Sequence, residues 1–158
     1  MERESTLNPA ASRVEVREIL HGSAAYADAC RLRHEVLRKP LGMDLFAEDL
    51  EQEKSQIHFG LFEGEHLVAC LVVVPLDAGK AKLRQMAVAA ERQRQGLGRR
   101  LVPEVELELG RRGFRQLELH ARLTAEGFYR KLGYCRRGDV FTEVGIPHVA
   151  MEKRLGWV

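Results

Sequence analysis

The sequence predicts an α/β fold built on a single mixed, twisted sheet of about six to seven strands flanked by helices. Strand patterns and amphipathic helix patterns alternate through the middle of the 158-residue chain, as in other folds of this class. Leu67–Val74 is almost entirely apolar, as expected for a central strand covered on both faces. A chain of this length usually forms one domain, so we expect a flexible tail over residues 1–12 and a single domain over residues 13–158.

The first half of the chain predicts a strand, a helix and a hairpin. Val14–Ile19 alternates between apolar and polar residues, as a half-buried strand does. Ser23 is a suitable N-cap for a helix that runs to Leu37, and the segment around Pro40 should end that helix. The acidic segment Asp44–Lys54 predicts a short second helix. The hairpin strands are expected at Ile57–Phe62 and Leu67–Val74.

The second half predicts two more helices, each placed between strands. After a strand at Ala81–Ala89, an apolar residue recurs every four positions at Leu97, Leu101, Val105 and Leu109, which indicates a core-facing helix. Pro103 lacks a backbone donor, so we expect a kink there or a later start of the regular helix. A short helix should follow a strand at Gln116–Ala121, and the last strands are expected at Tyr134–Phe141 and Ile146–Lys153.

Composition excludes several classes of protein. The chain is 45% hydrophobic and 30% charged with a net charge of +2, so no nucleic-acid or membrane partner is expected. Three scattered cysteines (Cys30, Cys70 and Cys135) predict reduced thiols rather than a disulfide framework, and no metal site is expected. No apolar stretch has the length of a membrane span and no signal peptide is recognisable, so we expect a cytoplasmic location.

The most informative segment is residues 85–101, in which an apolar strand leads into a basic loop and then into a helix. Gly96 and Gly98 allow a ligand to approach the backbone closely. The first N–H groups of a helix are unpaired, and the helix dipole adds roughly half a positive charge there, which suits a phosphate. Four arginines strengthen the positive field: Arg92, Arg94, Arg99 and Arg100. The segment therefore predicts a phosphorylated cofactor.

The spacing of the segment distinguishes between kinds of phosphate-binding loop. A P-loop requires more widely separated glycines followed by Lys-Ser/Thr, which are absent from this segment. A dinucleotide fingerprint requires a third glycine where Leu101 stands, although Glu118 lies near the distance expected of a ribose-binding acid. What remains, Gln93-x-x-Gly96-x-Gly98 after a strand, resembles the acyl-CoA pyrophosphate loop of the GNAT superfamily of N-acetyltransferases. A dinucleotide-binding protein stays as the weaker alternative.

Two later blocks extend this resemblance in the same order along the chain. The strand pattern at Gln116–Ala121 followed by Phe128-Tyr129-x-x-x-Gly133-Tyr134 is similar to the GNAT segment ending Phe-Tyr-x-x-x-Gly-aromatic. The block from Phe141 to Met151, with Glu143 and Gly145-Ile146-Pro147-His148, resembles the ending of a bacterial GNAT subgroup. The resemblance covers Leu67 to Leu155 well and the first third of the chain loosely.

The resemblance implies acetyl-CoA as the cosubstrate, with an amine attacking the thioester directly. The loop would give its N–H groups to the pyrophosphate, and the preceding strand would pair with the pantetheine arm. The implied cofactor-binding residues are Met86, Ala87, Val88, Gln93, Arg94, Gln95, Gly96, Leu97, Gly98, Arg99, Arg122, Ala125 and Tyr129. Arg122 departs from the family, which often has asparagine there, but a guanidinium can still reach a phosphate.

Proton transfer is expected to involve Tyr129 and a base. In the family, the residue at the position of Tyr129 protonates the departing thiolate, while on residue type alone this tyrosine is an aromatic core residue beside Phe128. The base stays open among His120, Glu118, Glu143, His148 and water. His120 and Glu118 are two residues apart on a strand and so share a face, whereas His148 is alternatively a structural hydrogen-bonding residue.

The sequence thus predicts an acetyl-CoA-dependent N-acetyltransferase that acts on a primary amine of a small molecule. A protein or peptide amine is the second acceptor class, and a longer acyl-CoA is an alternative cosubstrate. The alternative from another class is a non-catalytic CoA-binding or regulatory module that keeps the fold. The resemblance also implies a homodimer.

Overall fold

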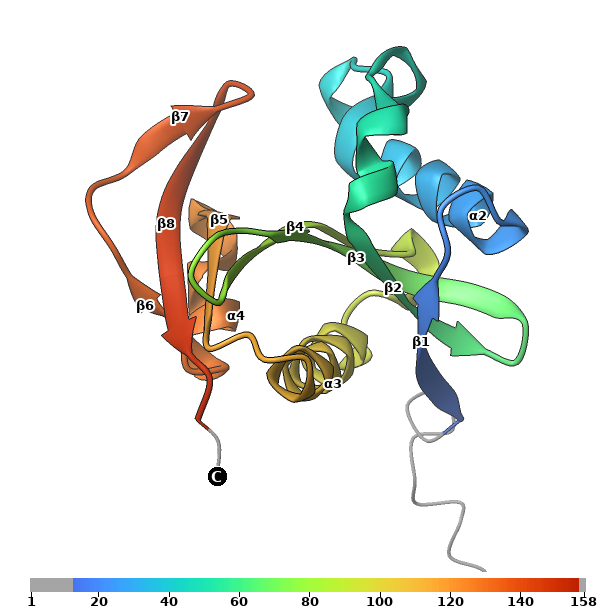
Figure 1. The fold of residues 1–158 in the computed structure, drawn as a ribbon. Coiled ribbons are helices and arrows are strands. Elements are labelled where there is room, and N and C mark those ends of the chain that lie inside the picture. Colours follow the sequence, from blue (N-terminus) through green and yellow to red (C-terminus); the bar gives the residue numbers. More distant parts are fainter. Residues whose placement is uncertain (1–12, 157–158) are drawn as a thin grey trace, which may run out of the picture. The chain divides into compact units, whose positions relative to one another are not determined.

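The computed structural model describes residues 13–156, so the expected tail over residues 1–12 lies outside the described part. The chain forms an α/β fold with an eight-stranded mixed sheet and flanking helices, which confirms the predicted class (Figure 1). Its elements are β1 (Val14–Ile19), α2 (Ala24–Arg33), β2 (Ile57–Glu63), β3 (His66–Pro75), β4 (Lys80–Val88), α3 (Leu97–Arg111), β5 (Gln116–Arg122), α4 (Glu126–Lys131), β6 (Cys135–Arg136), β7 (Phe141–Glu143) and β8 (Ile146–Arg154).

The sheet mixes parallel and antiparallel neighbours. Its hydrogen-bonded order is β1-β2-β3-β4-β5-β8-β6, and β7 pairs with β8 off this path. β1 and β2 are antiparallel, β5 and β8 are antiparallel, and β4 and β5 are parallel. The β4–β5 ladder covers Lys80–Leu83 and Gln116–Leu119, so it ends two residues before Gln85.

The described chain forms two compact units, and each is described by itself. Unit 1 contains the described residues up to Val72 together with Gln85–Val105. Unit 2 contains Val73–Arg84 and the described residues from Glu106 onward. Within residues 13–156, no helix combines the length and the apolar character that crossing a bilayer requires.

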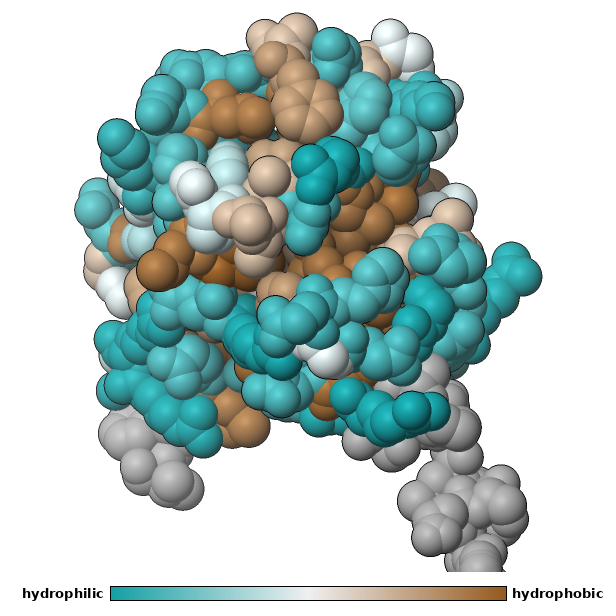
Figure 2. Space-filling view, turned by 90° about the vertical axis from the view of Figure 1, so that its right-hand side faces the viewer, coloured by the Kyte–Doolittle hydropathy of each residue, from teal (hydrophilic) through white to brown (hydrophobic). Residues whose placement is uncertain are grey.

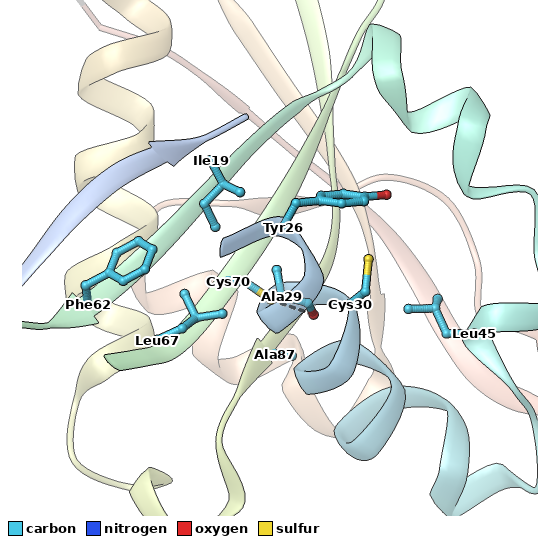
Figure 3. Close-up of a cluster of buried hydrophobic side chains, with 9 residues drawn as sticks. All are labelled: Ile19, Tyr26, Ala29, Cys30, Leu45, Phe62, Leu67, Cys70 and Ala87. Carbon is cyan, nitrogen blue, oxygen red and sulfur yellow. Dashed lines mark hydrogen bonds between the residues drawn. The ribbon is translucent and has the colours of Figure 1, made fainter. Parts of the chain in front are cut away.

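In unit 1, α2 packs on the strands through an apolar cluster. Ser23 caps the helix as predicted, because its Oγ accepts a hydrogen bond from the Tyr26 N–H at 3.1 Å. Figure 3 shows side chains of α2 and of the strands meeting in this cluster, whose members are Ile19, Tyr26, Ala29, Cys30, Leu45, Phe62, Leu67, Cys70 and Ala87. Burial of these side chains fixes α2 against the sheet.

The predicted end of α2 needs correction. The α-helix ends at Arg33, and the chain continues as a π-helical turn at His34–Arg38 and a 3₁₀ turn at Lys39–Leu41. Pro40 supplies no backbone donor, and Gly42 then leaves the helical path with a φ of 72°. The break falls where the sequence predicted it, but the last turns before it are not α-helical.

The predicted second helix at residues 44–54 is also wrong. The segment forms two 3₁₀ helices, Leu45–Ala47 and Leu50–Ser55. Asp44 accepts a hydrogen bond from the Phe46 N–H at 2.9 Å, and Asp49 accepts one from the Glu51 N–H at 3.2 Å. Each aspartate therefore starts a short turn of its own, which competes with a continuous helix.

Helix α3 begins at Leu97 and continues through Pro103, so the alternative of a later start is wrong. The predicted apolar stripe is confirmed, because all of its members are 1% exposed or less: Leu97, Leu101, Val105 and Leu109. Proline removes one donor within the helix. The buried stripe holds the helix in place despite that loss.

In unit 2, α4 ends as the sequence predicts. Gly133 has a φ of 99°, and its N–H donates to the Arg130 carbonyl at 3.0 Å. The Tyr134 N–H donates to the Tyr129 carbonyl at 3.0 Å. These two bonds are those of a Schellman motif, in which glycine takes the left-handed position.

The strand predicted at Tyr134–Phe141 is wrong as a single element. Two short strands, β6 and β7, form there instead, both pairing with β8, and this division gives the sheet eight strands rather than six to seven. Gly138, with a φ of 90°, lies between them and turns the chain out of the extended path. Val144 and Gly145 then form the turn to β8 with φ values of 47° and 75°.

Candidate functional site

The basic loop of unit 1 leaves a run of backbone donors unpaired. After a 3₁₀ turn at Ala90–Arg92, Arg94 and Gly96 have left-handed φ values of 66° and 78°. Among the described residues, no group accepts a hydrogen bond from the backbone N–H of any residue from Arg94 to Arg99. Consecutive free N–H groups at a turn and a helix N-terminus form an anion-binding cradle.

The four arginines of this segment divide into two pairs. Arg92 donates to Glu63 at 2.9 Å and to Gln95 at 3.0 Å, and the Arg92 hydrogen bond lowers the pKa of the Glu63 carboxyl. Arg100 donates to the Val14 carbonyl at 3.0 Å. Both therefore hold the loop to its surroundings. Arg94 and Arg99 are exposed, and no residue in the described part of the chain pairs with them, so these two are the arginines available to an anion.

A cavity of about 510 Å³ in unit 1 is lined in part by Gln93, the residue that precedes the cradle. Gln93 itself is oriented by its Nε2, which donates to the Val88 carbonyl at 3.1 Å. The face of the molecule that carries α2 shows a band of apolar side chains bordered by hydrophilic ones (Figure 2). The cavity wall has the same mixed character, with lining residues Arg31, Leu32, Glu35, Val36, Pro40, His66, Leu67, Ala89, Ala90, Glu91 and Gln93.

Strand β4 bends in a left-handed conformation at Gln85, whose φ is 53°. The next residues, Met86–Val88, are those expected to face the pantetheine arm, and Ala87 is buried while its two neighbours are half-buried. The Gln85 Oε1 accepts a hydrogen bond from the Arg33 Nε at 2.8 Å. The sequence analysis did not find this contact, because the two residues are 52 positions apart and no local pattern links them.

Tyr129 lies in α4 of unit 2 and is half-buried. Its ring packs edge-on against Phe128 and Tyr134, with centroid distances of 4.9 and 5.7 Å. Burial raises the pKa of the phenol to about 12. No hydrogen-bond partner for its hydroxyl is found within residues 13–156, whereas the Tyr134 hydroxyl donates to Glu106 at 2.8 Å. Tyr129 therefore keeps its proton at neutral pH, and that proton is free to be donated.

His120 and Glu143, two of the predicted base candidates, are in direct contact. The His120 Nδ1 lies 2.8 Å from Glu143 Oε1, and Lys82 Nζ lies 3.4 Å from the same ring nitrogen. Burial alone would raise the pKa of the Glu143 carboxyl, but the hydrogen bond and the charge of His120 outweigh it and lower that pKa. Because a carboxylate only accepts, His120 Nδ1 donates to Glu143, and in the neutral form of the ring Nε2 then carries the lone pair.

His148 joins the same face of the β-strands. It pairs with Arg122 across β5–β8 and with Phe141 across β7–β8, and residues paired or two apart along a strand share a face. Its Nδ1 donates to the Ile146 carbonyl at 2.8 Å, so its Nε2 also keeps a lone pair. The Phe141 ring contacts both histidines, at 4.9 Å from His120 and 6.1 Å from His148.

Three other predicted residues have different surroundings. Glu118 shares the face of His120 but lies 3.8 Å from the Arg137 guanidinium, so its carboxylate is in an ion pair rather than free. Arg122 has no ion-pair partner among the described residues and stays available to an anion. Ala125 ends the 3₁₀ turn Leu123–Ala125 that precedes α4.

Comparison with known protein families matches residues 23–155 to the model of the acetyltransferase (GNAT) domain. The chain belongs to the GNAT acetyltransferase family. This confirms the family that the three sequence blocks indicated. In this GNAT chain, the unpaired N–H groups of the loop occupy the segment in which the resemblance implied a pyrophosphate site.

Relatives of this GNAT domain have been identified in Bacillus subtilis. The uncharacterized N-acetyltransferase YitI is 27% identical over 135 residues, which cover 81% of this chain and 91% of the relative. The uncharacterized protein YyaT is 37% identical over 75 residues, which cover 48% of this chain and 51% of the relative. The aligned part thus spans about half the length of YyaT.

Solved structures share the GNAT fold. A crystallised N-acetyltransferase candidate from Lactobacillus plantarum superposes with a TM-score of 0.80 at 24% identity, covering 90% of this chain and 98% of that one. An aminoglycoside 6'-N-acetyltransferase complexed with coenzyme A superposes with a TM-score of 0.75 at 20% identity, covering 91% and 98%. These structures agree on the fold.

Proposed function

We propose that this GNAT domain transfers an acetyl group from acetyl-CoA to a primary amine of a small molecule. The observation that carries the proposal is the cradle at Arg94–Arg99, where unpaired backbone N–H groups and two unpaired arginine side chains are available to a pyrophosphate. The main chain of Met86–Val88 would pair with the pantetheine arm. Arg122 and Ala125 in unit 2 are assigned to further contacts with the cofactor.

The proposed reaction is a direct attack on the thioester. The amine nitrogen forms a bond to the carbonyl carbon, and the bond from that carbon to sulfur breaks. The amine gives up its proton to His120 Nε2, which Glu143 orients through Nδ1. The departing thiolate takes the hydroxyl proton of Tyr129. His148 is the second candidate base, because its Nε2 also keeps a lone pair.

The cluster in unit 2 supports the proposed acceptor class. Glu143 is a partly exposed carboxylate, with 44% of its side chain accessible, in a cluster that also contains the Phe141 ring. An accessible carboxylate is enough to attract one ammonium group. We therefore place a small-molecule primary amine before a protein amine, which would need a longer docking surface.

Calorimetric titration with acetyl-CoA tests the cofactor, with NAD as the control ligand. Gly96→Glu adds a carboxylate to the cradle, and Gly64→Glu is its matched control, because both glycines have a positive φ (78° and 62°) and open space around an added Cβ. We expect micromolar binding that Gly96→Glu abolishes and Gly64→Glu keeps. Binding of NAD in place of acetyl-CoA would overturn the proposal in favour of a dinucleotide protein.

An amine screen with acetyl-CoA then tests turnover. Release of CoA thiol with small amines, and not with peptides, supports the proposed acceptor. Tight acetyl-CoA binding without turnover of any amine or peptide would favour a non-catalytic CoA-binding module. Faster turnover with a longer acyl-CoA than with acetyl-CoA would indicate that the transferred group is a longer acyl group rather than acetyl.

A further inference from the structure

A buried polar cluster in unit 1 ties the end of α2 to strand β4. Arg33, the last residue of α2, is 1% exposed. Its guanidinium donates to both carboxylate oxygens of Glu53, at 2.9 Å from Nη1 to Oε1 and 2.5 Å from Nη2 to Oε2. Its remaining edge, Nε, donates to Gln85 Oε1 at 2.8 Å. The arginine thus has a carboxylate on one side and the bend of β4 on the other.

Glu53 is itself held by two neighbours. The Tyr26 hydroxyl donates to Glu53 Oε1 at 2.7 Å. His58 Nε2 donates to the backbone carbonyl of Glu53 at 3.0 Å. These contacts join α2, the 3₁₀ helix Leu50–Ser55 and β2. A buried network whose members are all paired is rigid, so the position of the Arg33 guanidinium is fixed from three elements.

The backbone at Gln85 needs such support. A left-handed φ of 53° is unfavourable for a residue that is not glycine, and in a strand it persists only where the surroundings enforce it. The side-chain bond from Arg33 ties Gln85 to the buried polar cluster. The residues that follow, Met86–Val88, are those that the proposed function assigns to the pantetheine arm.

We propose that Arg33, held by Glu53, is a positioning residue that keeps Gln85 in its left-handed conformation and so aligns the main chain of Met86–Val88 for the pantetheine arm of the cofactor. The inference rests on the proposed function, since it assumes that acetyl-CoA binds along β4. It adds a role for a salt bridge that touches no part of the cofactor. Its prediction is a selective one: the pantetheine part of the ligand is affected, and the phosphate part is not.

The test compares two ligands in one pair of variants. Arg33→Met/Glu53→Gln removes the salt bridge without leaving a buried charge, and the amide oxygen introduced by Glu53→Gln can still accept from Tyr26. Lys54→Met/Glu51→Gln is the control, because it removes an ion pair from the same 3₁₀ helix as Glu53 at side chains that are 72% and 70% exposed and lie outside the cavity wall. The ligands are acetyl-CoA and 3′-phospho-ADP, which has the phosphates but lacks pantetheine, and calorimetry measures both.

We expect Arg33→Met/Glu53→Gln, the buried double variant, to bind acetyl-CoA about tenfold more weakly than the wild type does. Its affinity for 3′-phospho-ADP should be unchanged. The surface control should bind both as the wild type does. Adding Gln85→Gly to the buried double variant should restore most of the acetyl-CoA affinity, because glycine adopts a positive φ at no steric cost. Adding Gln85→Ala should not restore it.

Three results would overturn the inference: unchanged acetyl-CoA affinity, an equal loss for both ligands, or equal effects of the glycine and alanine additions. If the buried double variant does not fold, Gln85→Ala and Gln85→Gly in the wild-type background carry the test, and only the alanine should weaken acetyl-CoA binding. Wild-type protein that binds 3′-phospho-ADP but not acetyl-CoA would instead remove the proposed function, so the two failures are distinguishable.

Discussion

The Nδ1 atom of His120 lies 2.8 Å from Oε1 of Glu143, and this contact decides which nitrogen of the imidazole carries its hydrogen. The carboxylate accepts from Nδ1, so in the neutral form of the ring Nε2 carries the lone pair, directed away from Glu143. A histidine oriented in this way is suited to take a proton from an amine. Under the proposed function, Glu143 positions the base and is not the base itself.

Replacing Glu143 by Gln should lower kcat about tenfold, because the amide keeps the shape of the side chain but loses the charge that orients His120. The pKa of Glu143 is held below its ordinary value, so the wild-type carboxylate stays ionised throughout the range of about pH 5 to 8. Titration of Glu143 itself should therefore add no pH dependence to the ratio of wild-type to variant kcat in that range. A ratio that changes steeply within it would assign the pH-dependent step to another group.

Removing the hydroxyl of Tyr129 should impair turnover without destabilising the fold. We expect Tyr129→Phe to reduce kcat by about two to three orders of magnitude and to keep the acetyl-CoA affinity. Tyr134→Phe is the matched control, because it removes a hydroxyl that donates to Glu106. That control should cost about 1 kcal/mol of unfolding free energy and leave kcat nearly unchanged. Steady-state kinetics and urea unfolding of the two variants measure both effects.

Thiol labelling should distinguish the three cysteines. Cys135 is exposed, while Cys30 and Cys70 are buried. Burial raises the pKa of Cys70 to about 12 and also raises the pKa of Cys30, so neither forms the reactive thiolate near neutral pH. Iodoacetamide at pH 7.5 should modify Cys135 alone in the native protein, and all three after unfolding in urea, as peptide mass spectrometry can check. Rapid native labelling of Cys70 would contradict its buried position.

The Arg33–Glu53 pair should make stability depend on pH in the acid range. Burial opposes the charged form of Glu53, but the hydrogen bonds from Arg33 and Tyr26 outweigh it and lower the pKa of this carboxyl. A group whose pKa is lower in the folded state stabilises the fold above its unfolded pKa, and that contribution is lost as the pH falls through the folded pKa. The unfolding free energy should therefore decline below about pH 4.

The single change Arg33→Met isolates this pair at neutral pH. It should cost about 3–5 kcal/mol, because Glu53 is left charged and buried without its partner. Arg33→Met/Glu53→Gln should be more stable than the single variant. Urea unfolding of both proteins makes the comparison, and equal stability of the two would show that the charge of Glu53 is compensated elsewhere.

Features set by local sequence were predicted well. Ser23 starts α2 and Gly133 ends α4, since capping depends on one residue and its immediate neighbours. The apolar stripe from Leu97 to Leu109 correctly predicted α3. The helix forms in spite of Pro103, because burial of the whole stripe outweighs the loss of one backbone donor. The same local patterns indicated the cradle and the family.

Features that depend on distant contacts were not predicted. The bond between Arg33 and Gln85 joins residues that only the folded sheet brings together, and neither residue type marks the contact in advance. The segment from Tyr134 to Phe141 reads as one strand because it alternates, yet a glycine within it divides the pairing with β8. Likewise, the contact between His120 and Glu143 joins two of the predicted base candidates, which lie 23 positions apart in the sequence.

The six peptide groups from Arg94 to Arg99 share one further property: none of their N–H groups donates a hydrogen bond to a described group. In the free protein the amides at the exposed and half-exposed positions, Arg94–Gly96 and Arg99, should exchange rapidly with deuterium. A phosphate seated in the loop should slow that exchange at several consecutive positions. Occupancy of the site can thus be followed from the backbone alone, before any acceptor molecule has been found.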